Sequence, residues 1–297
     1  MRLLRLKTLH KIALASAAST LICATRKALG RDPVTYARRS GLQWRLDLRE
    51  GIDLAIYLFG QFERSTFQRY RRHLRPGAVA VDIGANIGAH TLPLAMLVGP
   101  SGRVLAFEPT VYAHAKLCAN IALNSDLSTR IAAEQMMLTA TESESAPPSL
   151  PSSWPLVHAV SRDEVHGGVP KSTVGARAGS LDSYLATRGI ERVDFIKLDV
   201  DGYECTVLDG SAKTLARDRP ILAFELAPDT LAGSGQSALG LLSRLFDLGY
   251  MVTPEDKDEP LHNASAFVSS IPRGASLNMF AFPDRQPPRE RLTGSLP

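Results

Sequence analysis

The strongest constraint on the fold of this chain is a repeated alternation between short apolar runs and segments with helical periodicity. Strands of about five residues that alternate with helices form right-handed crossover units on a parallel sheet, so we expect an α/β fold. The predicted strands are residues 78–83, 103–107, 131–138, 193–199, 221–226, 250–252 and 278–282. The predicted helices are residues 90–97, 111–123, 181–187, 203–216 and 238–248. The last two strands have no clear helix between them and are candidates for antiparallel pairing.

One domain accounts for most of the chain. A length of 297 residues suits a single large α/β domain, which we place at residues 41–285, with residues 286–297 as a C-terminal tail. Residues 141–180 are rich in Ser, Pro and Gly and too long for a routine connection, so this variable segment is either disordered or a lid. The three cysteines have no CxxC spacing, which is typical of reduced, structural thiols in a cytoplasmic protein.

A glycine turn follows the first strand of the predicted domain. Gly84 and Gly88 allow a sharp bend and a close approach of backbone to a ligand, and the first N–H groups of the next helix are expected to be free to donate. The dinucleotide fingerprint G-x-G-x-x-G is absent, because Asn86 stands at its middle position and Asp82 ends the strand. A carboxylate there repels a pyrophosphate but suits a cation. S-adenosylmethionine carries a sulfonium and an ammonium and no phosphate, so the turn favours that cofactor.

A second carboxylate supports this interpretation. Glu108 ends the strand at 103–107, twenty residues after Gly88. An acid at the tip of the second strand can accept hydrogen bonds from both ribose hydroxyls of a nucleoside. The alternative is an ordinary strand–turn–helix unit without a ligand. The combination of Asp82, Gly84 and Glu108 at these spacings favours a nucleoside site.

A second acidic cluster follows the strand at 193–199. Asp199 lies at the carboxyl end of this strand, where ligands bind in open α/β sheets, and Asp201 and Glu204 come directly after it. One of these carboxylates could be a general base, or the cluster could hold a divalent cation. Alternatively, Asp201 caps the next helix and Glu204 interacts with the helix dipole. Lys197 shares the strand face of Asp199, where it could pair with a carboxylate or contact a substrate.

These motifs resemble those of the FkbM family of S-adenosylmethionine-dependent methyltransferases over about residues 45–285. The resemblance rests on residues 60–63, 81–92, 104–109, 117–124, 180–182, 194–204, 207–210 and 219–225. The family usually has Glu where this chain has Asp201.

The resemblance implies a seven-stranded Rossmann-like methyltransferase sheet that is mostly parallel, with its last strand antiparallel. Family members are typically O-methyltransferases that act on hydroxyls of sugars, glycolipids or polyketide-type products. We therefore expect a small-molecule or glycan hydroxyl as the acceptor. The predicted cofactor-binding residues are Asp82, Gly84, Ala85, Asn86, Gly88, Glu108 and Pro109.

The N-terminal 40 residues are predicted to form a basic helical arm. They contain nine of the 34 Lys and Arg residues and one acid, Asp32, so the rest of the chain is mildly acidic and not suited to nucleic acid. The uncharged run at 12–25 is too short to span a membrane. An exported signal peptide conflicts with an intracellular cofactor. We expect a helix packed on the domain, with peripheral membrane contact through residues 1–30 as an alternative.

The sequence as a whole predicts a cytoplasmic methyltransferase. The acceptor hydroxyl attacks the methyl carbon of the sulfonium in line, and the predicted catalytic residues are Asp199, Glu204, Asp201 and Lys197, with His90 as a further candidate base. No metal site is predicted, although a divalent ion at the acidic cluster is an alternative. Two other functions compete: a nicotinamide-dependent oxidoreductase on a similar sheet, and a binding protein that retains the fold without activity.

Overall fold

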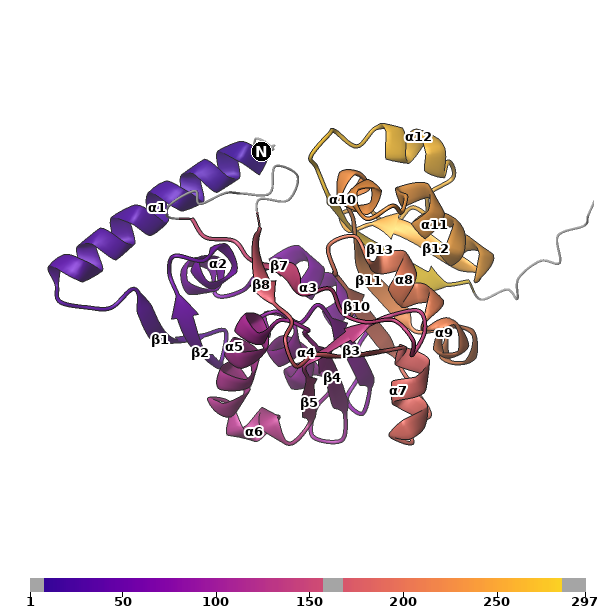
Figure 1. Ribbon diagram of the computed structural model, residues 1–297, viewed down its shortest axis with the longest axis horizontal. Coiled ribbons are helices and arrows are strands. Elements are labelled where there is room, and N and C mark those ends of the chain that lie inside the picture. The colour runs from indigo at the N-terminus through magenta and orange to yellow at the C-terminus, as the bar shows by residue number, and fades with distance from the viewer. Residues whose placement is uncertain (1–7, 157–167, 285–297) are drawn as a thin grey trace, which may run out of the picture.

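The computed structural model describes residues 8–156 and 168–284, which form a three-layer α/β structure with helices on both faces of a central sheet (Figure 1). The predicted tail at 286–297, the first seven residues of the arm and part of the segment at 141–180 lie outside the described residues. The α/β fold class predicted from the sequence is confirmed.

The central sheet has seven strands in the order β12-β13-β11-β10-β3-β4-β5. β13 is antiparallel to both of its neighbours, and the other pairs are parallel. The sheet is therefore Rossmann-like with its last strand antiparallel, as the sequence predicted. The strands are β3 (Val79–Ile83), β4 (Arg103–Phe107), β5 (Ile131–Glu134), β10 (Phe195–Leu198), β11 (Ile221–Leu226), β12 (Tyr250–Pro254) and β13 (Leu277–Pro283).

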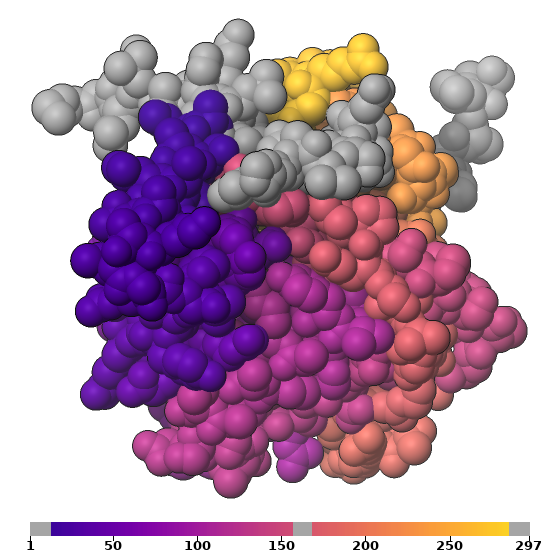
Figure 2. Space-filling view, turned by 60° about the vertical axis from the view of Figure 1, so that its left-hand side comes forward, coloured from indigo at the N-terminus to yellow at the C-terminus, as the bar shows by residue number. Residues whose placement is uncertain are grey.

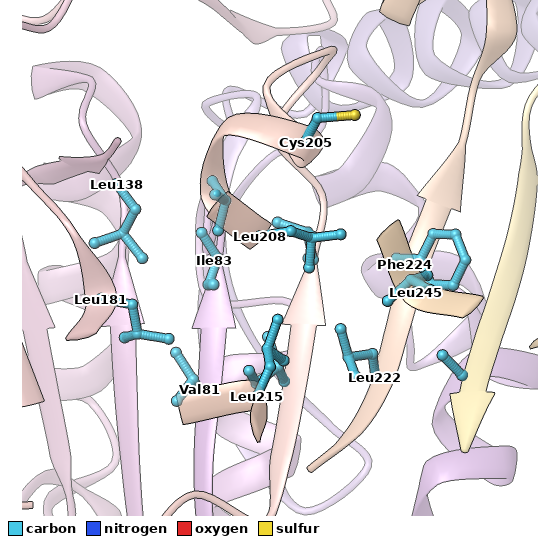
Figure 3. Packing of buried hydrophobic residues seen from close by; sticks show 14 of the residues in the cluster. Val81, Ile83, Leu138, Leu181, Cys205, Leu208, Leu215, Leu222, Phe224 and Leu245 are labelled. Carbon is cyan, nitrogen blue, oxygen red and sulfur yellow. The ribbon is translucent and has the colours of Figure 1, made fainter. Parts of the chain in front are cut away.

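Alternate residues of each central strand face opposite helical layers, because successive side chains of a strand point to opposite faces. Val81 and Ile83 of β3 pack with Leu208, Leu215 and other apolar side chains of one helical layer (Figure 3). This layer consists of α7 (Leu181–Thr187), α8 (Glu204–Asp209), α9 (Ala212–Asp218) and α11 (Ala238–Asp247). The other face is covered by α3 (Arg64–Arg71), α4 (Thr91–Leu97) and α5 (Val111–Ala122).

Two features of the C-terminal half differ from the helices that the sequence pattern indicated. The helix predicted at 203–216 is divided into α8 and α9 around Gly210, where an added Cβ would lie 2.0 Å from the carbonyl oxygen of Thr139. This close approach of two backbones separates the helices. The last two strands are joined through a helix that the sequence pattern did not reveal, α12 (Ala264–Ser269). The remaining short helices are α6 (Ser125–Ser128) and α10 (Pro228–Gly233).

The N-terminal segment forms a small unit on the side of the domain (Figures 1 and 2). It consists of α1 (Thr8–Ala28), the hairpin of β1 (Val34–Arg39) and β2 (Leu42–Asp47), and α2 (Gly51–Phe59). The prediction of a helical arm was therefore wrong for Val34–Arg39. Trp44 and Leu46 are buried in a cluster with Ile87 and Leu92 of the domain. No helix in the described part of the chain is long and apolar enough to cross a membrane.

The segment predicted as disordered or a lid contains three short strands where the structure describes it. β7 (Ser149–Ser153) and β8 (Val169–Ser172) form an antiparallel pair, and β9 (Arg177–Gly179) pairs with β6 (Met136–Leu138). The carboxylate of Glu50 accepts hydrogen bonds from Ser153 Oγ at 2.9 Å and from the backbone N–H of Trp154 at 2.9 Å. The β7–β8 pair is thereby fastened to the start of α2.

The turn after β3 is expected to tolerate no side chain at Gly84. Its φ is +81°, and an added Cβ would lie 1.8 Å from the carbonyl oxygen of Asp199. Gly235 has a similar φ of +72° with open space around it, so it isolates the cost of the backbone conformation. We expect Gly84→Ala to lower the free energy of unfolding by about 2–4 kcal/mol more than Gly235→Ala does. Urea unfolding of both variants measures the difference, and equal losses would contradict the close approach.

Candidate active site

A cavity of about 430 Å³ lies at the carboxyl ends of β3, β4, β10 and β11. This edge is where ligands bind in open α/β sheets, and the strand order changes direction there, between β3 and β10. Leu150, Pro151, Ser152 and Trp154 of the segment at 141–180 form part of its wall. The described part of this segment is therefore next to the cavity, and its role as a lid stays a prediction.

The glycine turn wraps around the end of β4. The backbone N–H groups of Gly84 and Ala85 both donate to the carbonyl oxygen of Phe107 at 3.0 Å, and the N–H of Asn86 donates to Glu108 Oε2 at 3.0 Å. Asn86 has a φ of +46°, a conformation that Asn adopts more readily than most residues. The prediction that glycines permit a sharp bend is confirmed, but these three N–H groups are used within the protein.

Glu108 is buried at the centre of a polar network. Its Oε1 accepts hydrogen bonds from the Thr110 backbone N–H at 2.9 Å and from Thr110 Oγ1 at 2.6 Å. Thr110 Oγ1 in turn lies 2.8 Å from Ser152 Oγ in β7. Burial raises the pKa of Glu108, and these hydrogen bonds oppose that effect. The carboxylate is therefore held in a fixed orientation between the glycine turn and Thr110, which contacts β7.

Asp82 and Lys197 are neighbours in the sheet. They are register partners on β3 and β10, and both side chains are buried on the face covered by α3 and α4. Asp82 accepts a hydrogen bond from Thr91 Oγ1 at 2.6 Å, and burial raises its pKa. Lys197 Nζ lies 2.8 Å from Asp199 Oδ2, so the lysine pairs with a carboxylate, one of the two roles that the sequence left open.

The loop after β10 presents two carboxyl groups to the cavity, Asp199 and Asp201, and turns a third, Glu204, away from it. Asp201 lines the cavity in a left-handed conformation with φ of +49°, and burial together with Asp199 and Glu225 raises its pKa well above the ordinary value. Glu204 accepts hydrogen bonds from the backbone N–H groups of Val200 and Gly202, both at 3.1 Å. Burial raises the pKa of Glu204 to about 7. Glu204 therefore fixes the loop that carries Asp201.

Three further carboxyl groups line the cavity that were not predicted as site residues, those of Glu63, Glu225 and Asp229. Glu225 comes near the end of β11, and burial and Asp199 raise its pKa to about 8. Glu63 Oε2 lies 3.1 Å from His90 Nε2; burial would raise the pKa of Glu63, but Lys197 and His90 hold it at about 2. Glu63 and Glu225 belong to motifs on which the family resemblance rests, and the sequence analysis assigned neither of them a role in the site.

The predicted site residues fall into two groups. The structure places these predicted residues in the cavity wall: Gly84, Ala85, Asn86, Glu108, Pro109, Asp199 and Asp201, together with His90. The others lie behind the wall or in its support: Asp82, Gly88, Lys197 and Glu204. Among the residues that the structure describes, no group of three or more His, Cys, Asp or Glu is placed to hold a metal ion.

The chain is similar to known methyltransferases. The family model described as methyltransferase FkbM domain matches residues 82–252, more than half of the chain. The methyltransferase sdnD of Sordaria araneosa is 34% identical over 155 residues, which are 44% of this chain and 59% of that protein. The chain therefore spans about three fifths of the length of this curated relative.

Solved structures give weaker likenesses. The methyltransferase FkbM from Methylobacillus flagellatus KT is 15% identical with a TM-score of 0.42, over 73% of this chain and 50% of that one. A SAM-dependent O-methyltransferase from Thermotoga maritima is 15% identical with a TM-score of 0.44, over 88% of this chain and 82% of that one. On the match of the family model to residues 82–252, the chain belongs to the FkbM methyltransferase family.

Proposed function

We propose that this protein transfers the methyl group of S-adenosylmethionine to a hydroxyl group of a sugar, glycolipid or polyketide-type acceptor. The observation that carries the proposal is the cavity at the carboxyl edge of the sheet, in which Glu108 is held beside a glycine turn that has no phosphate cradle. Its volume of about 430 Å³ lies within the range of small-molecule sites.

The residues at one end of the cavity fit a nucleoside. Glu108 stands where a carboxylate accepts hydrogen bonds from two ribose hydroxyls. Phe107, Met136 and Leu138 give the same end an apolar wall for a base. Asp199 and Asp201 lie farther along the wall, where they suit the positive charges of S-adenosylmethionine. This cofactor supplies, when bound, an electrophilic methyl group on a sulfonium.

The competing nicotinamide function is disfavoured by charge. None of the described residues that line the cavity is a Lys or Arg, whereas six of them are Asp or Glu. The N–H groups of Gly84, Ala85 and Asn86 donate within the protein, so they are not available to a pyrophosphate. A dinucleotide would therefore place two negative charges beside carboxylates without compensation.

We assign the general base to Asp201. The reaction forms a bond between the acceptor oxygen and the methyl carbon, breaks the bond from that carbon to sulfur, and moves the hydroxyl proton to the base. Asp201 lines the cavity, and its raised pKa makes its carboxylate a stronger proton acceptor than an ordinary Asp. Lys197 and Glu204 act as positioning residues, since they hold Asp199 and the loop backbone.

The first test of this function is cofactor binding. We expect wild-type protein to bind S-adenosylmethionine and not NAD⁺ in calorimetric titrations. Glu108→Gln should weaken S-adenosylmethionine binding by about 10–100-fold, because an amide loses the charge and one of the acceptor oxygens. Glu191→Gln, a neutralisation of an exposed acid before β10, is the matched control and should leave binding unchanged. Equal affinities of Glu108→Gln and wild type would remove Glu108 from the site.

The second test concerns the base. Transfer of labelled methyl to an extract from cells that lack the protein should fall by about 10²–10⁴-fold in Asp201→Asn, with cofactor affinity preserved. Because a base acts in its ionised form and the pKa of Asp201 is raised, the wild-type rate should increase with pH well above the range of an ordinary Asp. The residual rate of Asp201→Asn should lose this dependence. An unchanged pH profile would rule out Asp201.

A further inference from the structure

The cavity has two chemically different ends. One end follows β4 and β6 and is formed by Glu108 with the apolar side chains of Met136 and Leu138. The other end follows β10 and β11 and approaches β13. Its wall consists of Phe62, Glu63, His90, Asp201, Tyr203, Glu225, Asp229 and Ser276. If the nucleoside occupies the first end, as proposed above, the second end is left for the acceptor.

The second end has more negative than positive charge. One of its four carboxyl groups, that of Glu63, has polar partners: His90 Nε2 lies 3.1 Å from it, and the Asn278 amide donates a hydrogen bond to it at 2.9 Å. The nearby lysine, Lys197, is engaged with Asp199 at 2.8 Å. Within the described residues, Asp201, Glu225 and Asp229 form no ion pair with a Lys or Arg of this chain.

A partly buried carboxyl group without a neighbouring cation is costly to ionise, and its pKa is raised as a result. Burial and the neighbouring carboxylate of Asp199 raise the pKa of both Asp201 and Glu225, the latter to about 8. A metal ion could compensate such charges, but the described residues are not arranged to coordinate one. A protonated amine could also compensate them, because it needs two or three acceptors and no coordination geometry.

We propose that the acceptor carries a protonated amine next to the hydroxyl that is methylated, and that Glu225 and Asp229 bind this amine at the end of the cavity beside Asp201. This inference rests on the proposed function and narrows it to amino-alcohol acceptors, such as amino sugars. Phe62 and Tyr203 give the same end aromatic surface, which also attracts cations. Phosphorylated or carboxylated acceptors are excluded by the same charges.

Three small probes of similar shape test the charge preference directly. They are trans-2-aminocyclohexanol, trans-1,2-cyclohexanediol and trans-2-hydroxycyclohexanecarboxylate, titrated into the full-length protein saturated with S-adenosylhomocysteine and followed by NMR. We expect the amino alcohol to bind about tenfold or more tightly than the diol, and the hydroxy acid to bind more weakly than either. Equal or tighter binding of the diol or the acid overturns the proposal, as does no amine binding at about 20 mM.

Substitutions in the cavity wall show which residues cause the preference for the amino alcohol. Glu225→Gln should reduce the advantage of the amino alcohol over the diol to less than about threefold, and Asp229→Asn should reduce it in the same direction. Glu191→Gln removes the same charge at the opposite end of β10 and should preserve the full preference. A preference that survives both cavity variants places the amine elsewhere and refutes this site.

Binding of S-adenosylhomocysteine is measured first, and it separates the two proposals. If it fails, the methyltransferase site is misassigned. If it succeeds in wild type and in both cavity variants while the amine preference is absent, only the acceptor class is wrong.

Discussion

The site depends on the contact between two loops at the centre of the sheet. The turn after β3 and the loop after β10 approach so closely that the carbonyl oxygen of Asp199 occupies the position of a side chain at Gly84. This approach is available only to glycine, both because of the space and because φ is positive. It brings the turn that holds Glu108 and the loop that holds Asp201 into one wall. The two ends of the cavity that are proposed to hold the nucleoside and the acceptor are therefore built on the same backbone contact.

The charges of the site depend in a similar way on one residue, Lys197. Lys197 is buried among acids on the face that α3 and α4 cover, and Asp199 is its direct partner. Its positive charge also favours the ionised forms of Glu63 and Asp82, because it lowers the pKa of both. Asp199 and Glu63 raise its pKa against the effect of burial, so it remains protonated. A single lysine cannot compensate every carboxylate in this region. The charge that remains uncompensated is at Asp201 and Glu225, which both line the cavity, and ligands with positive charge are the natural occupants.

The sheet and the strand-end acids of the site could be predicted from the sequence, and the side-chain contacts between distant segments could not. Strand tips are readable from pattern, so Asp82, Glu108 and Asp199 were assigned to the carboxyl edge correctly. Direct contact with a ligand was less predictable, because Asp82 and Lys197 belong to the edge yet are turned into the protein. Glu63 and His90 meet only through the packing of α3 against the sheet, and no spacing in the sequence encodes a contact between residues 27 positions apart.

The segment at 141–180 illustrates the same limit. Its composition indicated an irregular segment, and it did not indicate that Ser152 would reach Thr110, the residue that orients Glu108. Through these hydrogen bonds, the carboxylate that is proposed to hold the ribose is linked to Ser152, which lines the cavity. We therefore expect a ribose that binds Glu108 to act also on the hydrogen bonds that join Glu108 through Thr110 to Ser152.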